Sequence, residues 1–201
     1  DETEAAKRQT AELGVKSEVF TSDPLALPEI RNNPKDRCYW CKRKIFQTFL
    51  DVCRARRIAH LLDGTNADDG HVYRPGRRAL KELGVLSPLA SLGFTKQEIR
   101  KLSAERGLPT ASKPSMPCLA TRFEYGAELT PERIGQAGRG EAFLRSLLPE
   151  TADVRLRVQG KNARIEVPPA SFELILKNRA AIAETLHGLG FEFVTLDLEG
   201  Y

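Results

Sequence analysis

The chain has 201 residues and a formal net charge of +4, with 41% hydrophobic and 29% charged residues, which is ordinary for a soluble protein of one large or two small domains. It has no run of about 18 apolar residues, which excludes a membrane-spanning helix, and its opening DETEAAKR lacks the apolar core of a signal peptide. We therefore expect a cytoplasmic protein, whose net charge is too small to indicate nucleic-acid binding by itself.

The first half of the chain alternates between helical and extended patterns. Helices are predicted over residues 1–13, 38–59, 77–84 and 95–107, the last with a capping box formed by Thr95 and Glu98. Strands are predicted over residues 15–22, 60–64 and, as a strand or an extended link, 85–93. Strands that alternate with helices indicate βαβ units, so we expect an α/β fold with a parallel sheet. Because a strand normally precedes such an opening helix, we also expect a segment before residue 1.

The chain changes character at residues 108–118, LPTASKPSMPC, where three prolines exclude a helix. We place the domain boundary just after this loop, which divides the chain into residues 1–118 and 119–201. The second part has predicted elements over residues 130–148 (helix, with Thr130 as N-cap), 153–168 (hairpin), 171–190 (helix) and 191–198 (strand). These elements predict a smaller α+β domain with an antiparallel sheet.

Two of the four cysteines, Cys38 and Cys41, are separated by two residues. Because the chain has no secretory signal, a disulfide between them is not expected. Cys38 and Cys41 share one face at a helix start, where the helix N-terminus and nearby basic residues are expected to favour thiolates. Cys118 ends the proline-rich loop. Three cysteines suit a 4Fe–4S cluster with one open iron, or a zinc with an open position, and a chance pair of buried cysteines is the remaining alternative. Cys53 lies on an apolar helix stripe and is expected in the core.

A polar loop, DGTNADD, follows the predicted strand over residues 60–64. At the carboxyl edge of a parallel sheet, Asp63, Asn66 and Asp68 could hold a metal or contact a nucleotide. Arg74, a few residues on, could contact phosphate. An ordinary polar turn explains the same residues equally well.

Two further basic features suit an anionic ligand. Residues 31–57 include nine basic residues against two acidic ones, although a solvated helix face gives the same pattern. Arg155 and Arg157 alternate on one face of a predicted strand and could form an anion fork. A cross-strand salt pair with Arg164 and Glu166 is the alternative, and the residues alone favour it.

Six segments in this order resemble the LarE family of ATP-dependent sulfur transferases, which help to build the nickel-pincer nucleotide cofactor of lactate racemase. They are RCYWCK, DGTNADDGHVYRPG, LGVLSPL, KPSMPCLATRFEYG, VRLRV with ARIEVP, and FEFVTLDLEGY. The resemblance covers essentially the whole chain. It implies a PP-loop ATP-pyrophosphatase domain, of the adenine nucleotide α-hydrolase type, followed by a smaller C-terminal domain in a homo-oligomer.

The resemblance also implies a reaction. ATP, with Mg²⁺, would adenylylate a carboxylate of pyridinium-3,5-biscarboxylate mononucleotide, and a sulfur nucleophile would displace AMP to leave a thiocarboxylate. Some members sacrifice the sulfur of one cysteine, whereas others use three cysteines and a 4Fe–4S cluster whose open iron carries sulfide. Pro117 stands where the sacrificed cysteine aligns, so the resemblance implies the cluster type and a sulfide donor as partner.

Site residues follow from the same resemblance. Those assigned to the catalytic site are Cys38, Cys41, Cys118, Arg122 and Glu141, with the three cysteines as cluster ligands. Those assigned to the ATP site are Asp63, Asn66, Asp68 and Arg74. Arg155 and Arg157 would hold the phosphate of the mononucleotide. Glu173 matches an acidic residue of the family only if a one-residue gap is allowed.

One motif of the family, the PP-loop S-G-G-[VI]-D-S, has no counterpart in this chain. Its absence agrees with the expected segment before residue 1, and the chain by itself is not expected to hydrolyse ATP. Two alternatives remain, namely a PP-loop tRNA thiolation enzyme and a zinc-stabilised nucleic-acid-binding module. The C-terminal hairpin and the ending FVTLDLEGY favour a small-molecule substrate over nucleic acid.

Overall fold

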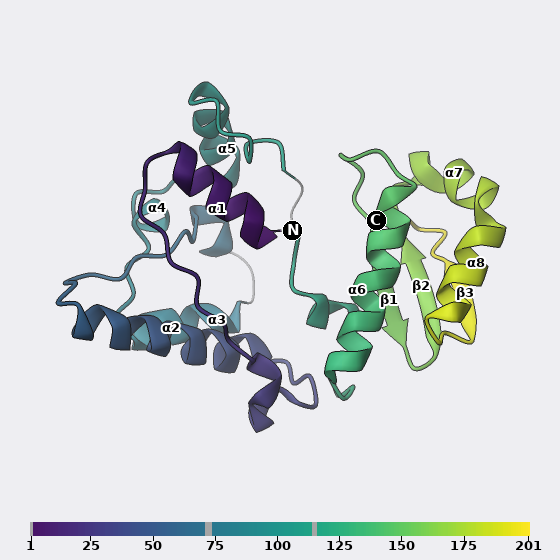
Figure 1. The fold of residues 1–201 in the computed structure, drawn as a ribbon, viewed down its shortest axis with the longest axis horizontal. Helices are drawn as coiled ribbons and strands as arrows, with labels where there is room; N and C mark the ends of the chain where they lie inside the picture. The colour runs from purple at the N-terminus through teal and green to yellow at the C-terminus, as the bar shows by residue number, and fades with distance from the viewer. Residues whose placement is uncertain (1, 71–73, 114–115) are drawn as a thin grey trace.

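The computed structural model of the chain describes residues 2–70, 74–113 and 116–201 and has a mixed α/β architecture. Helices α1 to α5 come from the first half of the chain and lie on the left of Figure 1. Helices α6 to α8 and a three-stranded sheet come from the second half and lie on the right. None of the described helices is long and apolar enough to cross a membrane.

The predicted helices of the first half are confirmed to within four residues at each end, and a further short helix lies in residues 85–93, where a strand or an extended link was expected. The helices are α1 (Glu2–Glu12), α2 (Arg37–Ala55), α3 (Pro75–Glu82), α4 (Pro88–Ser91) and α5 (Lys96–Glu105), with short 3₁₀ turns η1 (Pro24–Ala26), η2 (Pro28–Ile30) and η3 (Ala67–Gly70). The capping box of α5 is formed as predicted. The Glu98 backbone N–H donates to the Thr95 hydroxyl at 3.2 Å, and the Thr95 N–H donates to the Glu98 carboxylate at 2.8 Å.

The predicted strands of the first half do not form a sheet among the described residues. Residues 15–22 contain no strand, and residues 60–64 and 85–93 contribute one isolated parallel bridge, between Leu62 and Leu86. A strand persists only where a neighbour takes up its backbone N–H and C=O groups. Among the described residues of this half, such pairing occurs only at the bridge between Leu62 and Leu86. The prediction of a parallel sheet in this half was therefore wrong.

The second half contains the sheet. Its elements are η4 (Leu119–Arg122), α6 (Pro131–Ser146), β1 (Arg155–Gln159), β2 (Asn162–Glu166), η5 (Pro169–Ser171), α7 (Phe172–Lys177), α8 (Arg179–Gly188) and β3 (Phe193–Leu196). The predicted hairpin is confirmed: β1 and β2 are antiparallel, with Gln159 opposite Asn162 across a two-residue turn. Gly160 has φ 59°, as the favoured hairpin turn requires.

Two predictions about the end of the chain were wrong. The helix expected over residues 171–190 is interrupted at Asn178 and forms α7 and α8. The closing strand β3 pairs with β2 in parallel, so the sheet, ordered β1-β2-β3, is mixed rather than antiparallel. The two helices carry the chain back to the end of the sheet where β2 began, which is the connection that parallel strands need.

The hydrophobic core lies between one face of this sheet and helices α6 and α8. Leu156, Val158 and Ile165 are buried there. Gly140 lets α6 lie close to the sheet, because a Cβ atom at this position would overlap the Leu156 side chain and lie 3.0 Å from Leu186 Cδ2. Since side chains alternate along a strand, the neighbours of Leu156 and Val158 project from the other face.

Candidate functional site

The sheet face away from α6 carries arginines. The hairpin register places Arg157 directly opposite Arg164, and Arg155 opposite Glu166. Like charges in this position repel. Glu166 relieves the repulsion, because its Oε2 accepts a hydrogen bond from Arg157 Nε at 2.8 Å and its Oε1 accepts one from Arg164 Nη2 at 2.8 Å. The Glu166 carboxylate thus bridges the two guanidinium groups and holds them side by side.

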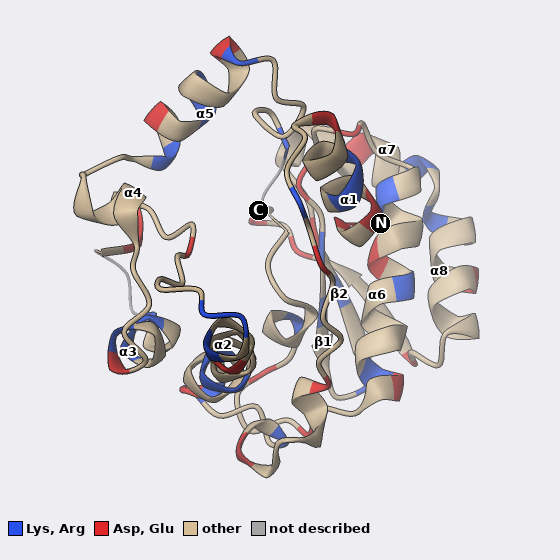
Figure 2. Cartoon of the chain, turned by 60° about the vertical axis from the view of Figure 1, so that its left-hand side comes forward, with Lys and Arg blue, Asp and Glu red and all other residues tan. Residues whose placement is uncertain are grey.

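These two arginines line a hollow of about 360 Å³, which we call the arginine pocket. Its full lining is Arg37, Thr121, Arg122, Phe123, Glu124, Tyr125, Arg157, Gln159 and Arg164. Four guanidinium groups and one carboxylate line it, and Glu166 and Glu141, outside the lining, pair with three of the four guanidinium groups. The remaining donors of these planar groups suit an anionic ligand. Arg37 comes from the start of α2, whose other basic residues are visible in Figure 2.

Arg155 does not line the arginine pocket. Its side chain is 2% exposed, and its Nη1 donates to the carbonyl of Val154 at 2.8 Å. The Tyr201 ring covers its guanidinium group, 4.7 Å from the ring centroid, and the Tyr201 hydroxyl accepts a hydrogen bond from Nη2 at 3.1 Å. The predicted role of Arg155 in phosphate binding stays a prediction.

Sequence reasoning did not assign Arg37 and Arg164 to the anion site. Arg164 could have been found from the hairpin turn, because a two-residue turn between Gln159 and Asn162 forces Arg164 opposite Arg157. Arg37 had no such signal. Its place in the pocket depends on how α2 lies against residues 123–125, which no local pattern encodes.

Arg122 and Glu141, both predicted to be catalytic, form a buried ion pair with side chains 2% and 7% exposed. Arg122 donates from Nε to Glu141 Oε2 at 2.5 Å and from Nη2 to Oε1 at 2.7 Å. Glu141 also accepts the backbone N–H of Leu156 at 3.2 Å. The pair therefore ties η4 to α6 and to the edge of β1, and its catalytic role stays a prediction.

The three candidate ligand cysteines lie near one another. Cys38 and Cys118 are exposed and Cys41 is half-buried. Burial raises the pKa of the Cys41 thiol, and negative charge on Cys118 and Cys38 raises it further, against smaller lowering effects of Arg37 and Lys42. The expectation that the helix start favours the Cys41 thiolate was therefore wrong, because burial dominates. Among the described residues, no three Cys, His, Asp or Glu side chains lie close enough to hold a metal ion.

Close packing of α3 on α2 fixes the backbone at Cys38. A Cβ atom on Gly76 would lie 3.2 Å from the Cys38 carbonyl oxygen and 2.9 Å from Lys42 Cδ, so only glycine fits here without a shift. Cys53, predicted to be in the core, is 9% exposed, which confirms that prediction.

A second cavity, of about 620 Å³, opens beside Cys118, and we call it the cysteine cavity. It is lined by Glu2, Met116, Pro117, Cys118, Leu119, Arg122, Gly138, Glu141, Ala142, Arg145 and Ser146. Arg122 lines both this cavity and the arginine pocket. The structure therefore brings Cys118, Arg122, Glu141 and Arg157 into one region.

Asp63 lies at the end of the isolated bridge, in the polar loop predicted to bind a nucleotide. Its Oδ1 accepts a hydrogen bond from Ser87 Oγ at 2.5 Å, Thr65 donates to Oδ2, and Lys42 Nζ is 3.9 Å away. Burial raises the pKa of the Asp63 carboxyl, but these hydrogen bonds and the Lys42 charge outweigh it and hold that pKa below its ordinary value. Asp63 is thus ionised and already hydrogen-bonded at neutral pH.

The other predicted nucleotide contacts also have partners, either within the loop or at the start of α5. Asn66 and Asp69 exchange backbone–side-chain hydrogen bonds of 3.2 and 3.3 Å, and Arg74 pairs with Asp69 at 3.0 Å. Asp68 accepts the backbone N–H of Lys96 at 2.8 Å, at the start of α5. These bonds agree with the polar-turn alternative, and nucleotide binding stays a prediction. Residues 71–73 of the loop lie outside the described residues.

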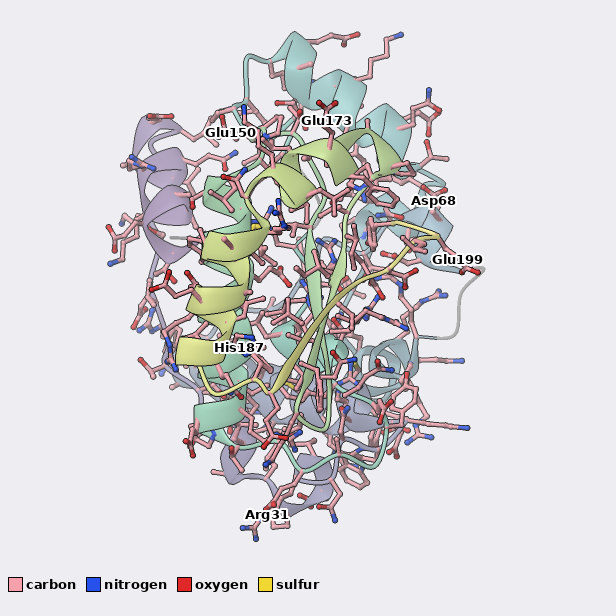
Figure 3. The ribbon with its side chains drawn as sticks, turned by 90° about the vertical axis from the view of Figure 1, so that its right-hand side faces the viewer. Arg31, Asp68, Glu150, Glu173, His187 and Glu199 are labelled. Carbon is pink, nitrogen blue, oxygen red and sulfur yellow. The ribbon has the colours of Figure 1, made fainter. Side chains whose placement is uncertain are left out.

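Glu173 lies apart from these cavities. It is exposed on α7, and Figure 3 shows it at the far end of the helical layer from His187. It lines neither the arginine pocket nor the cysteine cavity. Its assignment by the one-residue gap stays a prediction.

Comparison with known proteins gives three relatives, while no family model matches the chain. An uncharacterized protein of Synechocystis is 39% identical over all of this chain and 75% of its own length. The pyridinium-3,5-bisthiocarboxylic acid mononucleotide synthase of Lactiplantibacillus plantarum is 35% identical over all of this chain and 72% of its own length. An uncharacterized protein of Methanocaldococcus jannaschii is 29% identical over 88% of this chain and 68% of its own.

Proposed function

The chain belongs to the family of pyridinium-3,5-bisthiocarboxylic acid mononucleotide synthases, and on this premise we propose that it transfers sulfur to the carboxylates of pyridinium-3,5-biscarboxylate mononucleotide. The product is the corresponding thiocarboxylate, an intermediate of nickel-pincer nucleotide cofactor synthesis. The reaction needs three things from the protein: a site for an anionic mononucleotide, an activated carboxylate and a sulfur nucleophile.

One observation carries this proposal, the arginine pocket beside the cysteine cavity. The phosphate of the mononucleotide binds among Arg157, Arg164 and Arg37, whose planar groups suit phosphate oxygens. The ring end of the substrate extends past Arg122 into the cysteine cavity, towards Cys118. The volume of the arginine pocket, about 360 Å³, is in the range of small-molecule sites.

The chemistry proceeds in two steps, because a carboxylate is a poor electrophile. A carboxylate oxygen attacks the α-phosphorus of ATP and pyrophosphate leaves, which gives an acyl-adenylate. A sulfide sulfur then attacks the acyl carbon, the C–O bond to AMP breaks, and a thiocarboxylate remains. The guanidinium group of Arg122 lies near this carbon and stabilises the negative charge that develops on its oxygen, while Glu141 keeps that group in place.

The donor set of Cys38, Cys41 and Cys118 fits a 4Fe–4S cluster bound by three residues. Their thiols lie close enough for the charge of two to raise the pKa of the third. Three cysteines leave one iron open, and when bound the cluster would supply a position that holds sulfide in deprotonated form. Among the described residues these three side chains do not lie close enough together to hold a metal ion, so no step of the reaction is assigned to the cluster.

ATP binding is part of the same proposal, with Asp63, Asn66, Asp68 and Arg74 as the residues of this chain that would contact the nucleotide. Asp63 and Asp68 already accept hydrogen bonds from the Ser87 hydroxyl and from the Lys96 backbone N–H, and the described residues do not form a Mg²⁺ site, so no step is assigned to that ion. The division into residues 1–118 and 119–201 and the homo-oligomer belong to the same proposal.

Mass spectrometry of the sulfur-transfer reaction tests the proposal. The full-length protein, reconstituted anaerobically with iron and sulfide, is incubated with ATP, sulfide and the biscarboxylate mononucleotide. We expect exchange of carboxylate oxygen for sulfur in the wild type and in Cys53→Ala, and none in Cys38→Ala, Cys41→Ala or Cys118→Ala. Turnover that persists in all three variants contradicts the assignment of these cysteines.

A further inference from the structure

Arg145 is a charged residue that faces the cysteine cavity and that the proposed mechanism does not use. It lies one helical turn after Glu141 on α6, with a side chain 27% exposed. Its Nη2 donates a long hydrogen bond of 3.4 Å to Glu141 Oε1. That oxygen already accepts a 2.7 Å bond from Arg122, so Glu141 needs no further partner.

Most of the hydrogen-bonding capacity of Arg145 is unused within the described part of the chain. A guanidinium group has five N–H donors in a planar fork that matches a carboxylate. Arg145 is 27% exposed, so water in the cavity can satisfy its free donors, and a carboxylate could take the place of that water as a charged acceptor. Arg145 therefore offers free donors to an anionic group at this end of the cysteine cavity.

The rest of the cavity suits a flat ring. Met116, Pro117, Leu119 and Ala142 contribute apolar walls, and the cavity volume of about 620 Å³ leaves room for an aromatic acid. Glu2, an acidic residue that also lines the cavity, is paired with Lys113 at 3.1 Å, so its charge is offset.

We propose that Arg145 binds the second carboxylate of the substrate ring and selects the biscarboxylate over pyridinium mononucleotides with a single carboxylate. The inference rests on the proposed function, which supplies a ring with two carboxylates. One carboxylate lies towards Cys118 for reaction, and the other pairs with the Arg145 fork. A monocarboxylate mononucleotide shares the ring, ribose and phosphate, so the second carboxylate is the only group by which the site can reject it.

Isothermal titration calorimetry with two ligands tests this role. Pyridinium-3,5-biscarboxylate mononucleotide and pyridinium-3-carboxylate mononucleotide are each titrated into wild type, Arg145→Gln and Arg139→Gln. Arg139 is exposed on the same helix and does not line the cavity, so its variant removes an equal charge elsewhere. We expect the wild type and Arg139→Gln to prefer the biscarboxylate by about tenfold or more, the effect of one charge-assisted hydrogen-bonded pair.

In Arg145→Gln the preference should disappear, because affinity for the biscarboxylate falls while affinity for the monocarboxylate stays the same. Unchanged monocarboxylate binding also shows that the variant is folded. A wild type without preference, or an Arg145→Gln variant that keeps it, overturns the inference but leaves the proposed function standing. A wild type that binds neither mononucleotide contradicts the proposed function, and the inference with it.

Discussion

The pKa of the Cys41 thiol depends on how close the other two candidate ligand cysteines lie, so it can be used to measure their proximity. Burial raises its pKa first, and the charges on Cys118 and Cys38 follow. Since a thiol reacts as its thiolate, a raised pKa moves its alkylation to higher pH. The pH dependence of Cys41 alkylation therefore reports whether Cys118 is a neighbour.

We predict that Cys118→Ala lowers the pKa of Cys41 and shifts the alkylation curve of Cys41 to lower pH. The curve is measured with iodoacetamide over a series of pH values, with the labelled peptide quantified by mass spectrometry. Cys53→Ala is the matched control, because Cys53 is buried in the core and does not contribute to the Cys41 shift. A Cys41 curve that is the same in wild type and Cys118→Ala would place the two thiols apart.

The Arg122–Glu141 pair supports the fold as well as the site. In Glu141→Gln the Arg122 charge remains buried without a counter-charge, which typically costs about 3 kcal/mol. We expect a loss of this size in the free energy of unfolding, measured by urea denaturation. Glu184→Gln, an exposed change on α8, should stay within about 0.5 kcal/mol of wild type. Equal stability of the two variants would mean that the buried pair does not hold η4 to α6.

At the scale of elements, the close packing of α6 on β1 depends on Gly140. We predict that Gly140→Ala destabilises the protein by about 1–3 kcal/mol, because the added methyl group overlaps Leu156 although alanine favours a helix. Gly188→Ala at the end of α8 is the control, since nothing lies within 4 Å of its Cβ position. It should leave stability unchanged or raise it. Thermal unfolding of both variants decides, and a stabilised Gly140→Ala would contradict this packing.

Sequence patterns correctly predicted the elements that depend only on residues close together in the chain. The capping box at Thr95 and the hairpin within residues 153–168 are examples, and both formed as predicted. Residues 15–22 have an equally good strand pattern but no partner among the described residues, so they form no strand. The direction of β3 was missed because the break at Asn178 and the path of α7 and α8 are tertiary features.

The candidate site likewise contains residues that could be predicted from the sequence and residues that could not. Cys38 with Cys41, and Arg157, were found because spacing along a helix or strand fixes which side chains share a face. The burial that raises the pKa of Cys41, and the arrival of Arg37 beside Arg157, depend on packing between distant segments. Such packing leaves no periodic pattern, which is why the arginine pocket could not be predicted as a whole.

At the scale of the whole molecule, a seam joins residues 31–33 to residues 123–129. Asn33 is buried with φ 45°, and its side-chain amide donates to the carbonyls of Phe123 and Glu124 at 3.1 and 2.7 Å. Leu129 N–H donates to the Arg31 carbonyl at 2.7 Å. This seam places the start of α2, with Arg37 and the cysteines, against the sheet that carries Arg157.

We predict that Asn33→Ala costs about 3 kcal/mol of unfolding free energy, from two lost hydrogen bonds to buried carbonyls and a backbone conformation that alanine disfavours. Arg57→Ala is the matched control, because Arg57 also has a positive φ, of 56°, but is exposed. Urea denaturation should show little change for the control. An Asn33→Ala variant as stable as Arg57→Ala would mean that the seam contributes nothing to joining the two halves.

The central claim is that the arginine pocket holds the phosphate of the mononucleotide beside the cysteine cavity. Calorimetric titration of the biscarboxylate mononucleotide, and of its nucleoside without the phosphate, into wild type and Arg157→Gln tests it as a double-mutant cycle. Arg179→Gln, an exposed change on α8, serves as the control for charge. We predict that Arg157→Gln weakens mononucleotide binding by about tenfold or more and leaves nucleoside binding unchanged, because the lost contact is to phosphate. Equal mononucleotide affinity for wild type and Arg157→Gln would contradict the claim.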